Sequence, residues 1–137
     1  MFFKKDKNKK KDLDIIKITA LLIHAAKIDN NYTIEEEKII KKTILILGAN
    51  NEKLEDIIQK AKETEKNSNQ IIEFTREVKI MNNENKKEIV EALWKIIYSN
   101  KDADMYETGL MRKLSGLMYI DNKIMGDIKD KIKKENS

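Results

Sequence analysis

The chain has 137 residues, of which 40% are hydrophobic and 38% are charged, and its formal net charge is +4. This length fits one domain with a single core, while the absence of cysteine excludes a disulfide framework and a thiolate metal site. The chain also has no proline and only four glycines, and it lacks long alternating apolar runs, so it is predicted to be an all-α protein.

The first eleven residues are rich in lysine, and we expect residues 1–11 to be a disordered basic tail ahead of a helical domain at 12–135. No apolar segment of signal-peptide type follows these lysines, and no later run is long enough to span a membrane. The sequence therefore predicts a cytoplasmic protein. Contact of the tail with anionic lipid is the alternative, and it would place the protein at the periphery of the inner membrane. No nucleic acid is expected as a partner, because short lysine runs at chain ends are usually solvated.

Apolar residues at helical spacing predict a first helix that begins within residues 12–14 and ends near Ile28. Thr33 followed by Glu36 is the capping-box signature of a second helix. Gly48 is expected to end that helix as a cap in the left-handed conformation.

Three further helices are predicted in the middle of the chain. One begins at Asn51, and a shorter one covers residues 71–81. The next helix follows Asn83 and is apolar around most of its circumference, so we expect its neighbours to bury it. Trp94, the only tryptophan, lies on this helix and is predicted to be buried.

Two more helices complete the pattern. Asp104 with Glu107 forms a second capping box, and Asp121 caps a last helix in which isoleucines recur every fourth residue. The sequence therefore predicts a compact bundle of about seven helices.

Two of the predicted helix pairs are related by a constant spacing. Thr33 and Asp104 are 71 residues apart, and so are Glu36 and Glu107. Both pairs follow the order long helix, acidic turn, capping box and helix. This pattern predicts an internal repeat of helical hairpins that pack about a pseudo-two-fold axis.

The two turns also carry a family resemblance. The first reads AAKIDNNYTIEEE (25–37), and the second reads ALWKIIYSNKDADMYETGLMRKLSGL (92–117). These segments resemble the TerB-like family, which includes tellurite resistance protein B and the N-terminal domain of the membrane co-chaperone DjlA. The resemblance covers roughly residues 15–130. It implies a non-enzymatic helical module that binds a protein partner or a divalent metal in a bacterial stress response, or alternatively an inner-membrane adaptor related to the DjlA domain.

Acidic residues at the two turns are the candidate site. The resemblance implies that Asp29, Glu36, Asp104 and Glu107 match acidic positions of the family, and Asp102 lies beside them in the second turn. Carboxylate oxygens are hard ligands that suit calcium, magnesium or manganese. Capping of the following helices also explains acidic groups here, since they interact favourably with a helix N-terminus. Metal binding and helix capping both remain open.

No catalytic constellation is recognisable in the sequence. His24 is the only histidine and has no cysteine or second histidine with which to bind zinc. Ser99 and Ser115 lack a histidine base at a recognisable spacing, and there is no glycine-rich phosphate loop. We therefore predict no catalytic or cofactor-binding residue and do not expect an enzyme.

Overall fold

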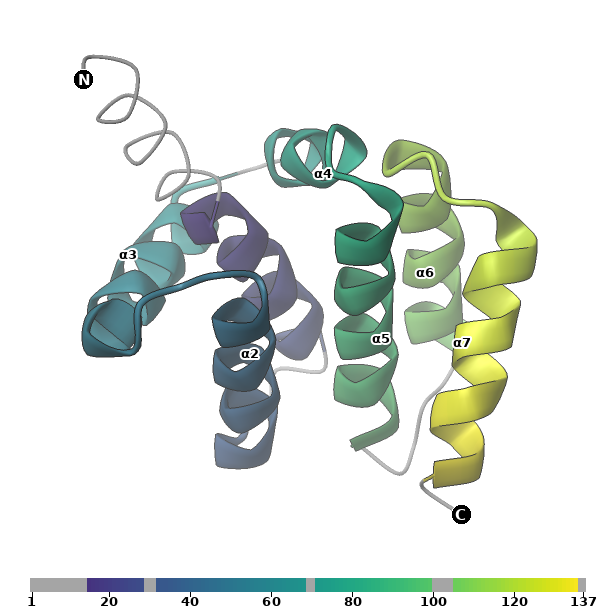
Figure 1. Cartoon of the computed structure of the whole chain (residues 1–137), viewed down its shortest axis with the longest axis horizontal. Coiled ribbons are helices and arrows are strands. Elements are labelled where there is room, and N and C mark those ends of the chain that lie inside the picture. Colours follow the sequence, from purple (N-terminus) through teal and green to yellow (C-terminus); the bar gives the residue numbers. More distant parts are fainter. Residues whose placement is uncertain (1–14, 29–31, 69–70, 100–104, 136–137) are drawn as a thin grey trace.

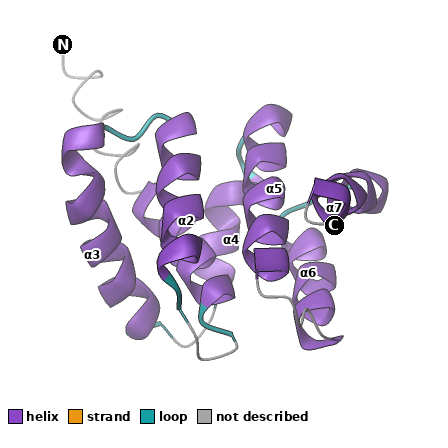
Figure 2. Ribbon diagram, turned by 90° about the horizontal axis from the view of Figure 1, so that it is seen from below, coloured by secondary structure: helices purple, strands orange, loops and turns teal. Residues whose placement is uncertain are grey.

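The computed structural model describes residues 15–28, 32–68, 71–99 and 105–135, apart from the side chains of residues 105–108. Its helices are the first helix (residues 15–26), α2 (Ile34–Ile46), the short 3₁₀ helix η1 (Asn51–Lys53), α3 (Leu54–Lys66), α4 (Ile72–Lys79), α5 (Asn83–Ser99), α6 (Met105–Leu117) and α7 (Asn122–Glu135) (Figure 1). No strand occurs in these ranges, which confirms the all-α fold (Figure 2). The predicted tail lies outside the described residues.

Local capping sets both ends of α2. The Thr33 hydroxyl accepts a hydrogen bond from the Glu36 amide at 3.1 Å, and the Glu36 carboxylate accepts one from the Thr33 amide at 2.9 Å. Gly48 follows the helix with a φ of 108°, and the amides of Gly48 and Ala49 donate to carbonyls of the last turn. The predicted capping box and glycine cap are therefore both confirmed.

The structure shows that α6 repeats α2 at the spacing seen in the sequence. The first residues of the two helices, Ile34 and Met105, are 71 positions apart, and so are their last residues. The amides of Tyr119 and Ile120 donate to carbonyls at the end of α6 just as those of the α2 cap do. The two helices therefore share both length and cap.

The same spacing extends the repeat to a third helix. Asn50 accepts a hydrogen bond from the amide two residues on at 3.0 Å, and Asp121, 71 positions later, does the same at 2.9 Å. These side chains begin η1 with α3 in one case and α7 in the other. We call residues 15–66 the first unit and residues 83–135 the second unit. Each unit has three main helices, and α4 connects them.

The core is built around α5. This helix packs against α2 and α7, and it lies between them in Figure 1. Its buried side chains confirm the prediction from its apolar circumference: Ile89, Val90, Ala92, Leu93, Trp94, Ile96 and Ile97. The helices in the described ranges do not combine the length and apolar character needed to cross a membrane.

Polar contacts join the first helix to α3 at the edge of the first unit. Lys27 Nζ lies 2.7 Å from Glu65 Oε1, and His24 Nδ1 lies 3.4 Å from Glu65 Oε2. The single histidine is therefore placed beside a carboxylate that belongs to a helix about 40 residues further along the chain.

Acid is expected to weaken this contact. Burial raises the pKa of Glu65, but hydrogen bonds from Lys27 and His24 outweigh that effect and leave the pKa below its usual value. A lowered pKa stabilises the fold above the unfolded-state pKa of about 4.3, and the contribution is lost as pH falls through the folded-state pKa. In urea unfolding between about pH 6 and pH 3, wild type should lose more stability than Glu65→Gln. The exposed Glu63, changed to Gln, is the control, and equal losses in wild type and Glu65→Gln would contradict the prediction.

Candidate functional site

The acidic site predicted from the sequence is only partly described. Asp29, Asp102 and Asp104 lie outside the described residues, and so does the side chain of Glu107. Glu36 is buried, and its carboxylate accepts the amide hydrogen bond that caps α2. Within the described ranges no group of three or more histidine, cysteine and acidic side chains could hold a metal ion. A divalent-metal site at these turns stays a prediction.

Thermal melts distinguish a metal site from helix caps. Because the Thr33 side chain caps α2, we expect Asp104, 71 residues later, to cap α6 in the same way, so Asp104→Ala should lose about 1 kcal/mol and Asp104→Asn almost nothing. Calcium, magnesium, manganese and EDTA should then leave the melting temperature unchanged. A cation-dependent rise that disappears in both Asp29→Asn and Asp104→Asn would instead establish the metal site, because only the folded state would bind the ion.

Tyr119 has the most unusual backbone of the described residues. Its φ of 55° is the only positive value at a non-glycine residue in the part of the chain that the structure describes, and the corresponding residue of the first unit is Gly48. A left-handed conformation costs a residue with a β-carbon roughly 1 kcal/mol. The Tyr119 side chain is 68% exposed, so burial does not offset this cost. Strained positions gather at functional sites, and Tyr119 therefore marks a candidate site.

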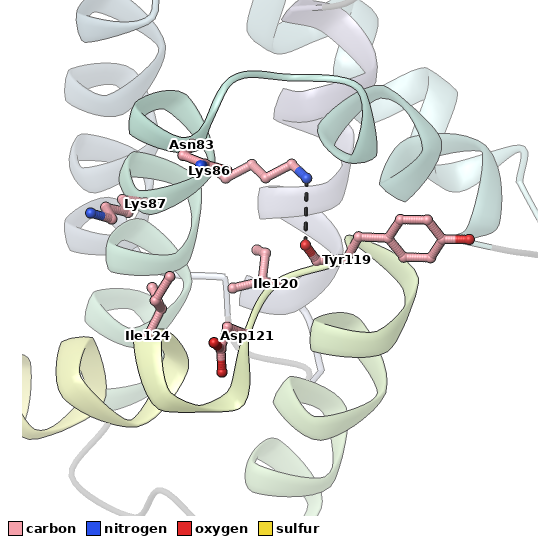
Figure 3. A pocket seen from close by; sticks show the side chains of 7 residues that line it. All are labelled: Asn83, Lys86, Lys87, Tyr119, Ile120, Asp121 and Ile124. Atoms are coloured by element: carbon pink, nitrogen blue, oxygen red, sulfur yellow. Dashed lines mark hydrogen bonds between the residues drawn. The ribbon is translucent and has the colours of Figure 1, made fainter.

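Two lysines from other helices contact Tyr119. Lys79 Nζ, at the end of α4, lies 4.3 Å from the centroid of the tyrosine ring. Lys86 Nζ, near the start of α5, donates to the Tyr119 carbonyl at 3.5 Å (Figure 3). Ile80, next to Lys79 in the chain, is 71% exposed. An aromatic ring, an isoleucine and two cations are thus presented together where α4, α5 and the α6–α7 turn meet.

A depression of about 210 Å³ lies beside this turn. Its lining comes from the start of α5 and from the α6–α7 turn: Asn83, Lys86, Lys87, Tyr119, Ile120, Asp121 and Ile124. Figure 3 shows Ile120 and Ile124 facing the space between the two segments, while the Tyr119 ring points away from it. We call Lys79, Ile80 and these lining residues the Tyr119 surface.

The Tyr119 surface is predominantly basic. Asp121 is its only acidic residue, and one of its carboxylate oxygens accepts the Lys123 amide at the start of α7. Among the described residues no carboxylate forms an ion pair with Lys79, Lys86 or Lys87. The surface can therefore attract acidic groups and contact apolar ones at the same time.

Sequence analysis did not identify the Tyr119 surface. One signal was present, since the spacing of 71 residues aligns Tyr119 with Gly48, where a helix cap favours glycine. The sequence did not indicate that lysines lie beside Tyr119, because Lys79 is forty residues away from it along the chain.

Comparison with known proteins identifies the family. Residues 16–130 match the family model described as tellurite resistance protein TerB. No curated protein and no solved structure matches the chain. The family match spans most of the chain and includes, in whole or in part, the seven main helices of the described residues, which confirms the resemblance found in the two turns. The protein therefore belongs to the TerB family.

Proposed function

We propose that this TerB-family protein is a non-enzymatic module of the cytoplasm that binds an acidic segment of a partner protein at the Tyr119 surface. The observation that carries the proposal is the exposed Tyr119 ring on a backbone that favours glycine. The description of the family as tellurite resistance protein supports a role in a bacterial stress response.

The shape of the surface favours a peptide segment over a small molecule. Sites for drug-sized ligands usually enclose about 300–1,000 Å³, whereas the depression measures about 210 Å³. A larger depression of about 560 Å³, which Tyr119 and Ile120 also line, is open to solvent and does not enclose a ligand. The smaller depression suits a single apolar side chain, which Ile120 and Ile124 would contact. Tyrosine is also enriched among the residues that contribute most to protein interfaces.

The charge of the surface favours an acidic partner. Lys79, Lys86 and Lys87 are grouped around the turn and lack carboxylate partners among the described side chains. Complementary charge speeds association and excludes basic competitors. The affinity should therefore fall as salt concentration rises.

Replacing Tyr119 by glycine should separate stability from binding. Glycine relieves about 1 kcal/mol of backbone strain, and loss of the contact with Lys79 offsets part of this gain by about 0.5 kcal/mol. Tyr119→Gly should therefore be at least as stable as wild type in urea unfolding. Its affinity for a partner peptide should fall at least about tenfold, because a central aromatic contact is lost.

Peptide display tests the proposal with a defined probe. A random-peptide library is selected on wild type and counterselected on Tyr119→Gly, and fluorescence anisotropy then measures the affinities of the selected peptides. We expect acidic residues next to a large apolar one, weaker binding to Lys79→Gln, and unchanged binding to Ile34→Ser. Ile34 is 74% exposed and begins α2, whose first turn lies at the opposite end of the molecule from α4 (Figure 1). Peptides that bind wild type and Tyr119→Gly equally would overturn the proposal.

A further inference from the structure

A second cavity, of about 140 Å³, lies between α5, α6 and α7. It shares no lining residue with the depression beside the α6–α7 turn, although a third, open depression shares lining residues with both. The polar side chains that line it are Trp94, Arg112, Ser115, Asn122 and Lys129. None of its lining residues is acidic.

The first unit has only two polar residues at the five equivalent positions, Lys41 and Asn51. The residues that lie 71 positions before Trp94, Ser115 and Lys129 are all isoleucines, and all three are buried in the core: Ile23, Ile44 and Ile58. The first unit therefore shows that apolar side chains at these three positions are enough to pack its helices together. The tryptophan, serine and lysine of the second unit need another explanation.

The charged residues at this site also differ between the two units, and the second unit is the more positive of the two. Arg112 corresponds to Lys41, whose Nζ lies 2.5 Å from the carboxylate of Glu55. Gly126 occupies the position of Glu55 in the second unit, and no described carboxylate pairs with Arg112. The second unit thus keeps the cation, lacks this carboxylate and gains a further cation in Lys129.

Trp94 lines this cavity and carries an unsatisfied donor. Its side chain is buried, and the indole Nε1 has no hydrogen-bond partner among the described residues. Lys129 Nζ lies 5.4 Å from the centroid of the indole ring. An indole nitrogen can only donate, and a buried donor without an acceptor is unfavourable. The nitrogen is inaccessible to solvent, so the cavity is in contact with the indole ring and not with its N–H group.

We infer that this cavity binds a small oxyanion, the carboxylate or phosphate group of a soluble ligand. Arg112 and Lys129 line the cavity and supply positive charge, and Trp94 lines it beside Lys129. Arginine is well suited to this role, because its planar donors match two oxygens of one anion. A volume of about 140 Å³ admits a group of a few heavy atoms, since one water takes about 30 Å³.

The single tryptophan makes the test specific to this site. In ¹⁵N-labelled protein the one indole N–H signal is followed by NMR during titration with sodium phosphate or sodium acetate, with sodium chloride keeping ionic strength constant. A saturable shift is expected because the indole ring lines the cavity, and the anion with the lower Kd identifies the preferred group. The same anion should raise the melting temperature, because it binds the folded state.

Matched variants show whether Arg112 and Lys129 are responsible for binding the anion. Arg112→Gln and Lys129→Gln should weaken binding at least about tenfold, as loss of a charge-assisted hydrogen bond implies. Lys113→Gln and Lys131→Gln remove a charge from the same two helices outside the cavity, and they should bind as wild type does. An indole signal that neither anion shifts, or that shifts equally in Arg112→Gln, would overturn the inference. Tyr119→Gly should leave this shift intact, so the inference and the proposed function can fail separately.

Discussion

Replacement of Trp94 by alanine is expected to lower the free energy of unfolding by about 3–5 kcal/mol. The Trp94 side chain is 4% exposed on α5, and its ring stacks on Tyr98 with the centroids 5.8 Å apart. Alanine would remove these contacts and enlarge a cavity that is already present between α5, α6 and α7. A small domain has about 5–15 kcal/mol of stability, so this variant should be close to unfolding.

Replacement by phenylalanine should be far less damaging. Phenylalanine keeps most of the ring and removes an indole N–H that lacks a partner among the described residues. An unsatisfied buried donor costs about 1–3 kcal/mol, which should offset most of the lost apolar contact. Urea unfolding followed by circular dichroism, in a buffer free of phosphate and carboxylates, measures both variants. If Trp94→Phe loses as much stability as Trp94→Ala, the N–H group does have a partner in the folded protein.

Phe74→Ala is expected to have a similar effect, about 3–5 kcal/mol, at the connection between the two units. Phe74 is the largest of the fully buried side chains, at 1% exposure, and α4 packs against α5 and α6. This helix has no counterpart in the repeat, so no second copy supplies the contact. Loss of the ring should loosen α4 from the second unit and lower the urea midpoint.

Ile72, on the same helix, provides the control for Phe74. It is 44% exposed, so Ile72→Ala should change stability by no more than about 0.5 kcal/mol. Equal effects of the two substitutions would show that α4 is held by its backbone and polar contacts, and not by the phenylalanine ring. A small effect at Phe74 alone would contradict the predicted packing.

The sequence by itself determined the helices and the repeat. Thr33 with Glu36, Gly48 and Asp121 mark helix ends in the structure where they were predicted to do so. Such caps can be predicted because they depend only on residues close together in the chain: a side chain that bonds to a nearby amide, or a glycine that adopts the left-handed conformation. The spacing of 71 residues was also visible, and the structure extends it from helix pairs to three-helix units.

The sequence also pointed to the TerB family, which the family match confirms. It did not decide between helix capping and metal binding at the acidic turns, and Asp29, Asp102 and Asp104 of these turns lie outside the described residues. Capping is a local interaction that one sequence can show, whereas a metal site requires oxygens from separate turns to converge. The metal site therefore stays a prediction that the melts described above can test.

Only the tertiary structure revealed the Tyr119 surface and the oxyanion cavity. Lys79 meets Tyr119 from forty residues away, and Lys129 meets Trp94 from a different helix. The sequence predicts that each of these residues is on or beside a helix, but their contacts depend on how α4 packs against the second unit and how α7 packs within it. That packing buries apolar faces without regard to the polar side chains at their edges, because the hydrophobic effect is not directional. Helical periodicity therefore predicts which residues are buried, and the packed helices decide which polar groups come together.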